Sequence, residues 1–246
     1  MSLRNLCFFT VMAAVFALPA GKTSDIEIRP ADARTAHSRN IEMRAVVRPV
    51  QSKNPSGLGA GKLLVASREL GDPNFAKTVI LLVHYDHDSV VGLMLNRRTD
   101  VPISRVLKQF EAAKDLSDPV YLGGPVETPT VFALLRSKDK LEGTEHVFGG
   151  IYWISSKAAL EKTIASRPGP GVFHLYLGYA GWTAEQLRTE VRLGGWFIFQ
   201  ADNQTVFNAD PDSLWREMIK KTELEIARST PEKPASFWEH MPAPQE

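Results

Sequence analysis

The sequence predicts an α+β domain built on a mixed, largely antiparallel sheet and covering about residues 61–221. Apolar, β-branched-rich runs of strand length follow one another through this region. Short polar turns separate some of these runs, whereas segments with apolar residues at helical spacing separate others. Strands that are joined in both ways favour an α+β fold over a doubly wound parallel sheet.

The first half of the domain is expected to contain a hairpin and one helix. A polar turn at residues 86–89 joins two strand-length runs and predicts the hairpin. Pro102 is placed to open a helix that extends through Phe110 to Ala113. The expected strands of this half cover residues 62–67, 79–85 and 90–96.

The second half begins with short strands, and a helix is expected at residues 157–165. A strand ending at residue 177 is followed by an expected turn at residues 178–182. The strands expected in this half cover residues 120–122, 131–135, 146–148, 151–154, 172–177 and 196–199.

Two further helices have clear start signals. Thr183 and Gln186 have the spacing of a capping box, in which the two side chains satisfy free amides at a helix start. Gly194-Gly195 is expected to end this helix in the left-handed conformation that glycine tolerates. Asp210-Pro211 then combines a cap with a first-turn proline and predicts the last helix.

The segments outside the domain are expected to differ from it in kind. Residues 1–20 hold one charge and a short apolar run, which is typical of a secretory signal peptide; an uncleaved anchor and an over-extended start are alternatives. Residues 21–60 are mildly basic and lack an apolar stripe, which predicts a disordered arm. Residues 222–246 are expected to form a C-terminal tail. No transmembrane segment is expected beyond the leader.

Composition argues against several functions. Without the leader, Lys+Arg falls from 29 to 28, because Arg4 is removed, and so equals the 28 Asp+Glu. A neutral chain lacks the basic excess of most nucleic-acid-binding proteins, so nucleic acid is a disfavoured partner. The single cysteine, Cys7, lies in the leader. The domain therefore contains no cysteine that could form a disulfide, act as a thiol nucleophile or bind a metal as a thiolate. No cofactor and no metal are expected.

Four ordered segments resemble the YqgE/AlgH family of bacterial proteins over about residues 61–221: LLVASRELGDPNFAKTVILLVHYD, VVGLMLNR, YLGGPV and GYAGWTAEQLRTEVRLGGWF. The resemblance implies an α+β fold whose bifurcated sheet closes into a pseudo-barrel flanked by helices. It also implies a cytoplasmic protein of undefined biochemical role, with a transcriptional-regulator label on some members. Arg68 and Arg98 depart from the family pattern, which tends to have proline at both positions.

The matching positions of the family pattern are Asp72-Pro73, Phe75, Gly92, Asn96, Gly123-Gly124-Pro125, Gly178 and Gly181-Trp182. Paired glycines after a strand let Gly123 and Gly124 approach an anion or a partner chain, although they equally permit a tight bend. Asn96 ends a neighbouring strand and could complete a polar site there. Trp182 belongs to an aromatic group that could line a ligand pocket, although core packing is the commoner role. These four residues are the candidate binding residues.

The titratable side chains give weaker evidence for a functional site than these motifs do. His84, Asp86, His87 and Asp88 lie within one short segment and could in principle bind a metal or transfer a proton. Strand alternation would point the two imidazoles to opposite faces, so a solvated hairpin turn is the preferred interpretation. His174 lies in an apolar strand and is expected to be a core histidine with satisfied ring nitrogens.

Three functions follow from these observations. The first is a non-catalytic binding or regulatory domain with a protein or small-molecule partner. The alternative is a hydrolase-like enzyme that uses the region of His84, Asp86 and His87. A transcriptional regulator ranks third, because neutral charge and the leader argue against it. The leader predicts export to the periplasm or cell envelope, whereas the family resemblance implies the cytoplasm.

Overall fold

A computed structural model describes residues 57–169, 171–208 and 210–229 of the chain. The predicted leader at residues 1–20, nearly all of the predicted arm at 21–60 and the end of the predicted tail lie outside these residues. Within the described ranges, no helix is both long and apolar enough to cross a membrane.

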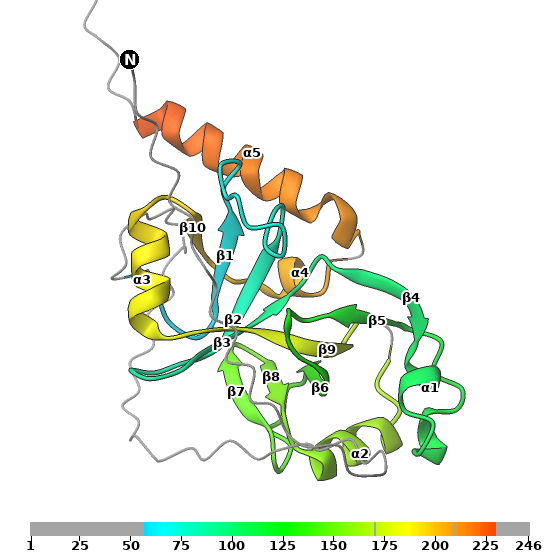
Figure 1. The fold of residues 1–246 in the computed structure, drawn as a ribbon. Helices are drawn as coiled ribbons and strands as arrows, with labels where there is room; N and C mark the ends of the chain where they lie inside the picture. Colours follow the sequence, from blue (N-terminus) through cyan, green and yellow to red (C-terminus); the bar gives the residue numbers. More distant parts are fainter. Residues whose placement is uncertain (1–56, 170, 209, 230–246) are drawn as a thin grey trace, which may run out of the picture.

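The fold is α+β, with a curled, largely antiparallel sheet that forms a half-barrel flanked by helices (Figure 1). The predicted fold class is therefore confirmed. Eight of the ten strands follow one another along the main path in the order β10-β1-β2-β3-β9-β6-β8-β7, and β4 and β5 lie off this path. Their bounds are β1 (Lys62–Ala66), β2 (Val79–Tyr85), β3 (Val90–Met94), β4 (Arg98–Pro102), β5 (Pro119–Leu122), β6 (Val126–Arg136), β7 (Glu145–Phe148), β8 (Ile151–Ile154), β9 (Phe173–Trp182) and β10 (Trp196–Gln200).

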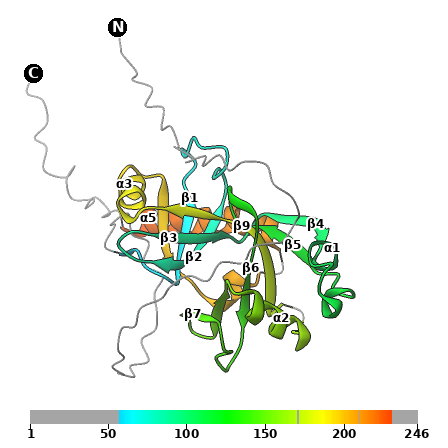
Figure 2. The same cartoon turned by 60° about the horizontal axis from the view of Figure 1, so that its bottom comes forward.

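The helices gather at two ends of the sheet. Helix α5 contacts β1 and α3 contacts β10, whereas α1 contacts β4 and α2 contacts η2 (Figures 1 and 2). The helical segments are α1 (Ile103–Val106), the 3₁₀ turn η2 (Glu111–Ala113), α2 (Lys157–Ala165), α3 (Ala184–Arg192), α4 (Asn203–Val206) and α5 (Pro211–Ser229).

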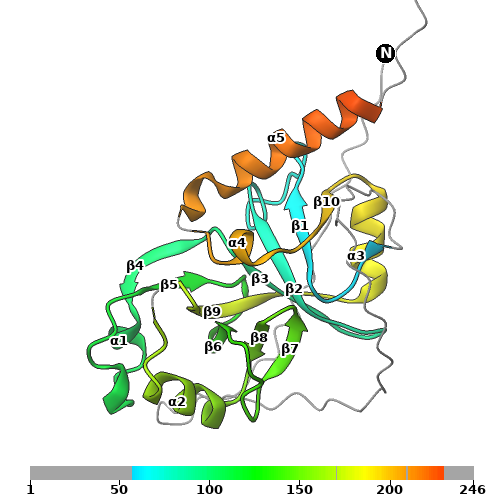
Figure 3. The same cartoon turned by 180° about the vertical axis from the view of Figure 1, so that it is seen from behind.

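The sheet separates two hydrophobic cores. Successive residues of a strand point to opposite faces, so Leu134 and Tyr176 join the larger core while Ala133 and Leu175 join the smaller one. The larger core lies under α3 and α5, and the smaller one lies under α1 and α2. Seen from behind, Figure 3 shows these two groups of helices on either side of β9.

Strand β9 is where the sheet divides. Its first half pairs in parallel with β5, through Leu175 opposite Val120, and its second half pairs antiparallel with β3, through Ala180 opposite Gly92. On the other edge, β6 pairs with the first half and reaches Tyr179. Two different strands thus share one edge of β9, which is the bifurcation that the family resemblance implies.

Glycines make this division possible. A Cβ on Gly123 would lie 2.2 Å from the carbonyl oxygen of Gly178, and a Cβ on Gly124 would lie 2.2 Å from the carbonyl carbon of Tyr179. Gly178 itself has a φ of +69°, and β9 continues through it. The predicted turn at residues 178–182 is therefore wrong: the glycine bends a strand and admits a second backbone, without ending the strand.

The helix predicted from Pro102 to Ala113 is also wrong. Pro102 ends β4, and the helical region breaks at Leu107, whose φ of −102° and ψ of 43° lie outside the helical range. The amide of Ile103 donates to the carbonyl of Asp118, so pairing with the approach to β5 competes with helix formation. Leu107, Phe110 and Ala113 are still buried, because two short turns preserve their spacing.

Several local predictions are confirmed. The β2–β3 hairpin forms, α2 covers the expected residues, and Pro211 opens α5. Thr183 caps α3 by accepting a hydrogen bond from the Gln186 amide, 3.1 Å away. The Gln186 side chain does not complete the capping box and instead donates to Glu190 at 3.0 Å. After α3, Gly194 has a φ of +81°, as expected of a helix-ending glycine.

Replacing Gly124 by alanine should destabilise the protein by about 3 kcal/mol, because the new methyl group would overlap rigid backbone. Gly71→Ala is the matched control, since nothing lies within 4 Å of a Cβ at that position. Urea denaturation of both variants measures the difference. Equal midpoints for the two variants would contradict the role assigned to the bifurcation.

Candidate functional site

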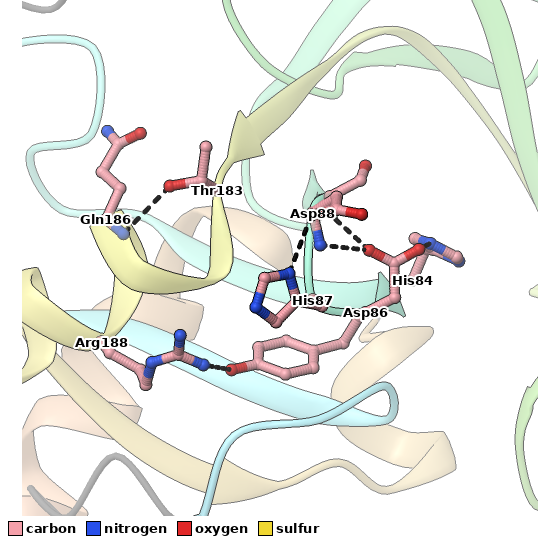
Figure 4. A network of polar contacts seen from close by, with 9 residues as sticks. His84, Asp86, His87, Asp88, Thr183, Gln186 and Arg188 are labelled. Carbon is pink, nitrogen blue, oxygen red and sulfur yellow. Dashed lines mark hydrogen bonds and ion pairs between the residues drawn. The ribbon is translucent and has the colours of Figure 1, made fainter.

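The tip of the β2–β3 hairpin is folded by one carboxylate. Asp86 Oδ1 accepts hydrogen bonds from the amides of Asp88 at 2.8 Å and Ser89 at 2.7 Å, and Asp86 Oδ2 lies 2.8 Å from His84 Nε2 (Figure 4). The bond to His84, followed by the two amides, holds the pKa of Asp86 below its usual value. Asp86 therefore has a structural role in the turn, whatever else it does.

The two imidazoles of this segment do not converge. His87 Nδ1 lies 2.8 Å from Asp88 Oδ1, and both side chains are more than nine-tenths exposed. His84 is paired with Asp86 and lies near Trp153, with 6.5 Å between the ring centroids. Within the described ranges, no three histidine, cysteine or acidic side chains are grouped closely enough to hold a metal ion. The hairpin matches the solvated turn preferred from the sequence.

Helix α3 contributes a charged array beside this hairpin. Glu185 accepts from Arg188 Nε at 3.1 Å and from Arg192 Nη2 at 3.0 Å, which lowers the pKa of Glu185. Arg188 also donates to the Tyr85 hydroxyl at 3.5 Å and so links α3 to the hairpin (Figure 4). We call the face made by these two elements the hairpin–α3 surface. Tyr85 and Arg188 are half-buried where the elements meet, and the exposed members are Asp86, His87, Asp88, Glu185 and Arg192.

Helix α3 is fixed to the sheet by a carboxylate clamp made by Glu190 with Trp182 and Trp196. Glu190 Oε2 accepts hydrogen bonds from Trp196 Nε1 at 2.8 Å and Trp182 Nε1 at 3.1 Å. Phe75 packs against both indoles, with ring centroids 5.5 Å from Trp182 and 5.8 Å from Trp196. The Glu190 carboxylate therefore joins α3 to β9 and β10, and the loop after β1 packs on the two indoles through Phe75.

Asn96 has a comparable bridging role. Its Oδ1 accepts from the Val79 amide at 2.9 Å, and its Nδ2 donates to the Lys77 carbonyl at 2.9 Å. Lys77 has a φ of +57°, so the amide of Asn96 supports a loop that carries backbone strain. The side-chain amide of this predicted site residue is thus bonded to the loop before β2 through Lys77 and to the start of β2 through Val79.

The four candidate binding residues do not surround a common point. The Gly123 amide donates to Leu177 and its carbonyl accepts from Met94, at the end of β3. Trp182 lies opposite Val90, at the start of β3. Gly124 packs on β9 next to Gly123. Whether any of these residues contacts a partner stays a prediction, but the structure assigns Asn96, Gly123 and Trp182 bonds within the chain.

His174 is not the satisfied core histidine that was expected. Its ring lies between Tyr121 and Phe207, with centroid distances of 4.7 and 4.8 Å, and Nδ1 is buried without a hydrogen-bond partner in the described part of the chain. Burial lowers the pKa of His174 to about 4, so the imidazole is neutral near pH 7. The sequence held no signal for this environment, because Phe207 reaches His174 only through the tertiary fold.

The geometry defines a structural class: an α+β half-barrel with a bifurcated sheet and a charged external face. The chain belongs to the AlgH-like family, whose family model matches residues 63–227. It is 32% identical over 168 residues to a UPF0301 protein of Chlorobaculum tepidum, covering 66% of this chain and 86% of the relative. It is 31% identical over 175 residues to one of Bacteroides fragilis, covering 70% and 86% respectively.

Two solved structures have similar folds. The solution structure of the AlgH protein from Pseudomonas aeruginosa is 28% identical with a TM-score of 0.54, covering 70% of this chain and 94% of that one. A crystal structure of a Corynebacterium diphtheriae protein is 21% identical with a TM-score of 0.57, covering 67% and 87% respectively, and this likeness concerns the fold alone. The family has no defined biochemical function.

Glu190→Ala should lower the free energy of unfolding by about 2–3 kcal/mol, because it leaves the fully buried Trp196 indole N–H without its acceptor. Glu190→Gln keeps an acceptor oxygen and should lower the free energy of unfolding by less than Glu190→Ala does. Glu185→Ala removes two surface ion pairs and a long, exposed hydrogen bond from Thr189 in the same helix; it is the control and should barely move the urea midpoint. Similar losses in the Glu190 and Glu185 variants would argue against the clamp.

Proposed function

We propose that this protein is a non-catalytic binding or regulatory domain that recognises a protein partner through the hairpin–α3 surface. The observation that carries the proposal is the contact between Arg188 and Tyr85, which joins two exposed elements into one face. The hairpin contributes acidic groups, and α3 contributes Arg188 and Arg192 together with the acidic Glu185, so the face carries both signs of charge. Such a pattern favours orientation-specific recognition of a complementary surface.

The support behind this face strengthens the proposal. The clamp at Glu190 fixes α3 on β9 and β10, and Asp86 fixes the hairpin turn. A surface that is ordered before binding loses less conformational entropy when a partner docks. Small-molecule sites are usually concave and mostly apolar, whereas most side chains of this face are charged and exposed, so a protein is the better match.

The hydrolase-like alternative rests on the pair formed by His84 and Asp86. A carboxylate that orients an imidazole is part of many nucleophilic and general-base sites. Regulation of transcription ranks third, since Arg188 and Arg192, which could contact phosphates, both pair with Glu185.

Affinity capture with the full-length protein tests the proposal. Arg188→Gln/Arg192→Gln should reduce recovery of a specific partner at least tenfold, whereas Lys162→Gln/Arg167→Gln, with the same loss of charge beside α2, should not. Circular dichroism and urea midpoints check that both variants fold. Equal recovery by the two double variants would reject the hairpin–α3 surface. Turnover of ester or phosphoester substrates that is abolished by His84→Ala would favour the hydrolase.

We also propose that the protein is exported, on the sequence of residues 1–20. Fractionation of the native protein with N-terminal sequencing should find a mature start near Gly21 in the periplasmic or envelope fraction. An intact Met1 in the cytoplasm would contradict export and restore the transcriptional regulator as a serious alternative.

A further inference from the structure

Two buried polar atoms on one face of β9 have no protein partner. The Tyr176 hydroxyl and His174 Nδ1 are both buried, and neither has a hydrogen bond to any described residue. Tyr176 is 0% exposed. Leaving a buried hydroxyl or ring nitrogen unpaired costs free energy, and native proteins commonly satisfy such groups with a bound molecule.

The two side chains are neighbours. They are two residues apart on one strand and so share a face, and their ring centroids are 6.4 Å apart. Tyr121, which lies opposite Tyr176 on β5, contacts both rings, with centroid distances of 5.5 Å to Tyr176 and 4.7 Å to His174. Phe207, which follows α4, covers the imidazole. Figure 1 shows β5 beside β9.

We propose that Tyr176 Oη and His174 Nδ1 form a buried binding site for one small, uncharged hydrogen-bonding molecule, such as water or a small alcohol or amide. A single oxygen that is hydrogen-bonded to both atoms can bridge a separation of up to about 5.6 Å. The two rings share one face of the strand, with centroids 6.4 Å apart. The Tyr176 hydroxyl can donate or accept, and Nδ1 does whichever its tautomer allows.

The surroundings favour an uncharged occupant. Burial raises the pKa of Tyr176 well above its usual value and lowers that of His174, so both groups are neutral near pH 7. Burial raises the pKa of Tyr121, and the Arg98–Asp212 ion pair, which also influences this pKa, has both side chains exposed, with 3.1 Å between its charged atoms. An ion placed between Tyr176 and His174 would therefore lack a buried counter-charge. This inference is independent of the proposed partner surface.

The sign of the change in Tm caused by Tyr176→Phe in the full chain shows whether the hydroxyl binds an occupant or is unpaired. If the hydroxyl binds an occupant, the variant loses that hydrogen bond and Tm should fall by about 2–4 °C. If the hydroxyl has no partner, its removal should leave Tm unchanged or raise it, which would overturn the proposal. Tyr152→Phe is the control, because the Tyr152 hydroxyl is not among the unpaired buried atoms.

Nuclear magnetic resonance of ¹⁵N-histidine-labelled protein provides a second test, which the proposal must pass in addition to the fall in Tm. Tyr176→Phe should shift the His174 Nδ1 resonance by several ppm if one molecule bridges the two atoms, and Tyr152→Phe should not. An unshifted resonance would also overturn the proposal. Mass spectrometry of the filtrate from denatured protein then distinguishes the sources: a stoichiometric organic compound identifies a small ligand, and its absence with both other requirements met identifies water.

Discussion

The close approach of backbone segments at Gly123, Gly124 and Gly178 is the constraint on which the rest of the structure depends. A side chain at any of these positions would overlap the main chain of a neighbouring segment. Because none is present, β9 can pair with β5 and β6 along its first half and with β3 along its second. The sheet therefore divides, curls into a half-barrel and presents two faces to two separate cores.

The most recognisable sequence motifs of the chain serve this architecture. The glycines admit close backbones, Asn96 supports the loop after β1, and Trp182 and Trp196 donate to one carboxylate on α3. Residues with such roles identify a fold without identifying a reaction, because function resides in sites carried by a fold. The family's motifs thus account for the shape of the protein, and the case for a function rests on other residues.

Those other residues occupy two contrasting environments. The hairpin–α3 surface consists of exposed charges that pair with one another, with Asp86 and Glu185 each serving more than one donor. The face of β9 that carries His174 and Tyr176 presents neutral groups, and His174 Nδ1 and the Tyr176 hydroxyl are buried there without a hydrogen-bond partner among the described residues. The first environment suits a protein partner with complementary charge and the second suits a small neutral molecule, so the two proposals can be tested separately.

The sequence alone determined the features that depend on interactions between residues close together in the chain. The β2–β3 hairpin, the Thr183 cap and the family were all predictable, because each depends on neighbouring residues or on ordered motifs. Tertiary structure decided the rest. It carried β9 through Gly178 and broke the helix predicted after Pro102. It also brought Phe207 onto His174 and left Nδ1 of that ring without a hydrogen-bond partner among the described residues. These outcomes depend on contacts between segments far apart in the chain, which periodicity and capping signals do not encode.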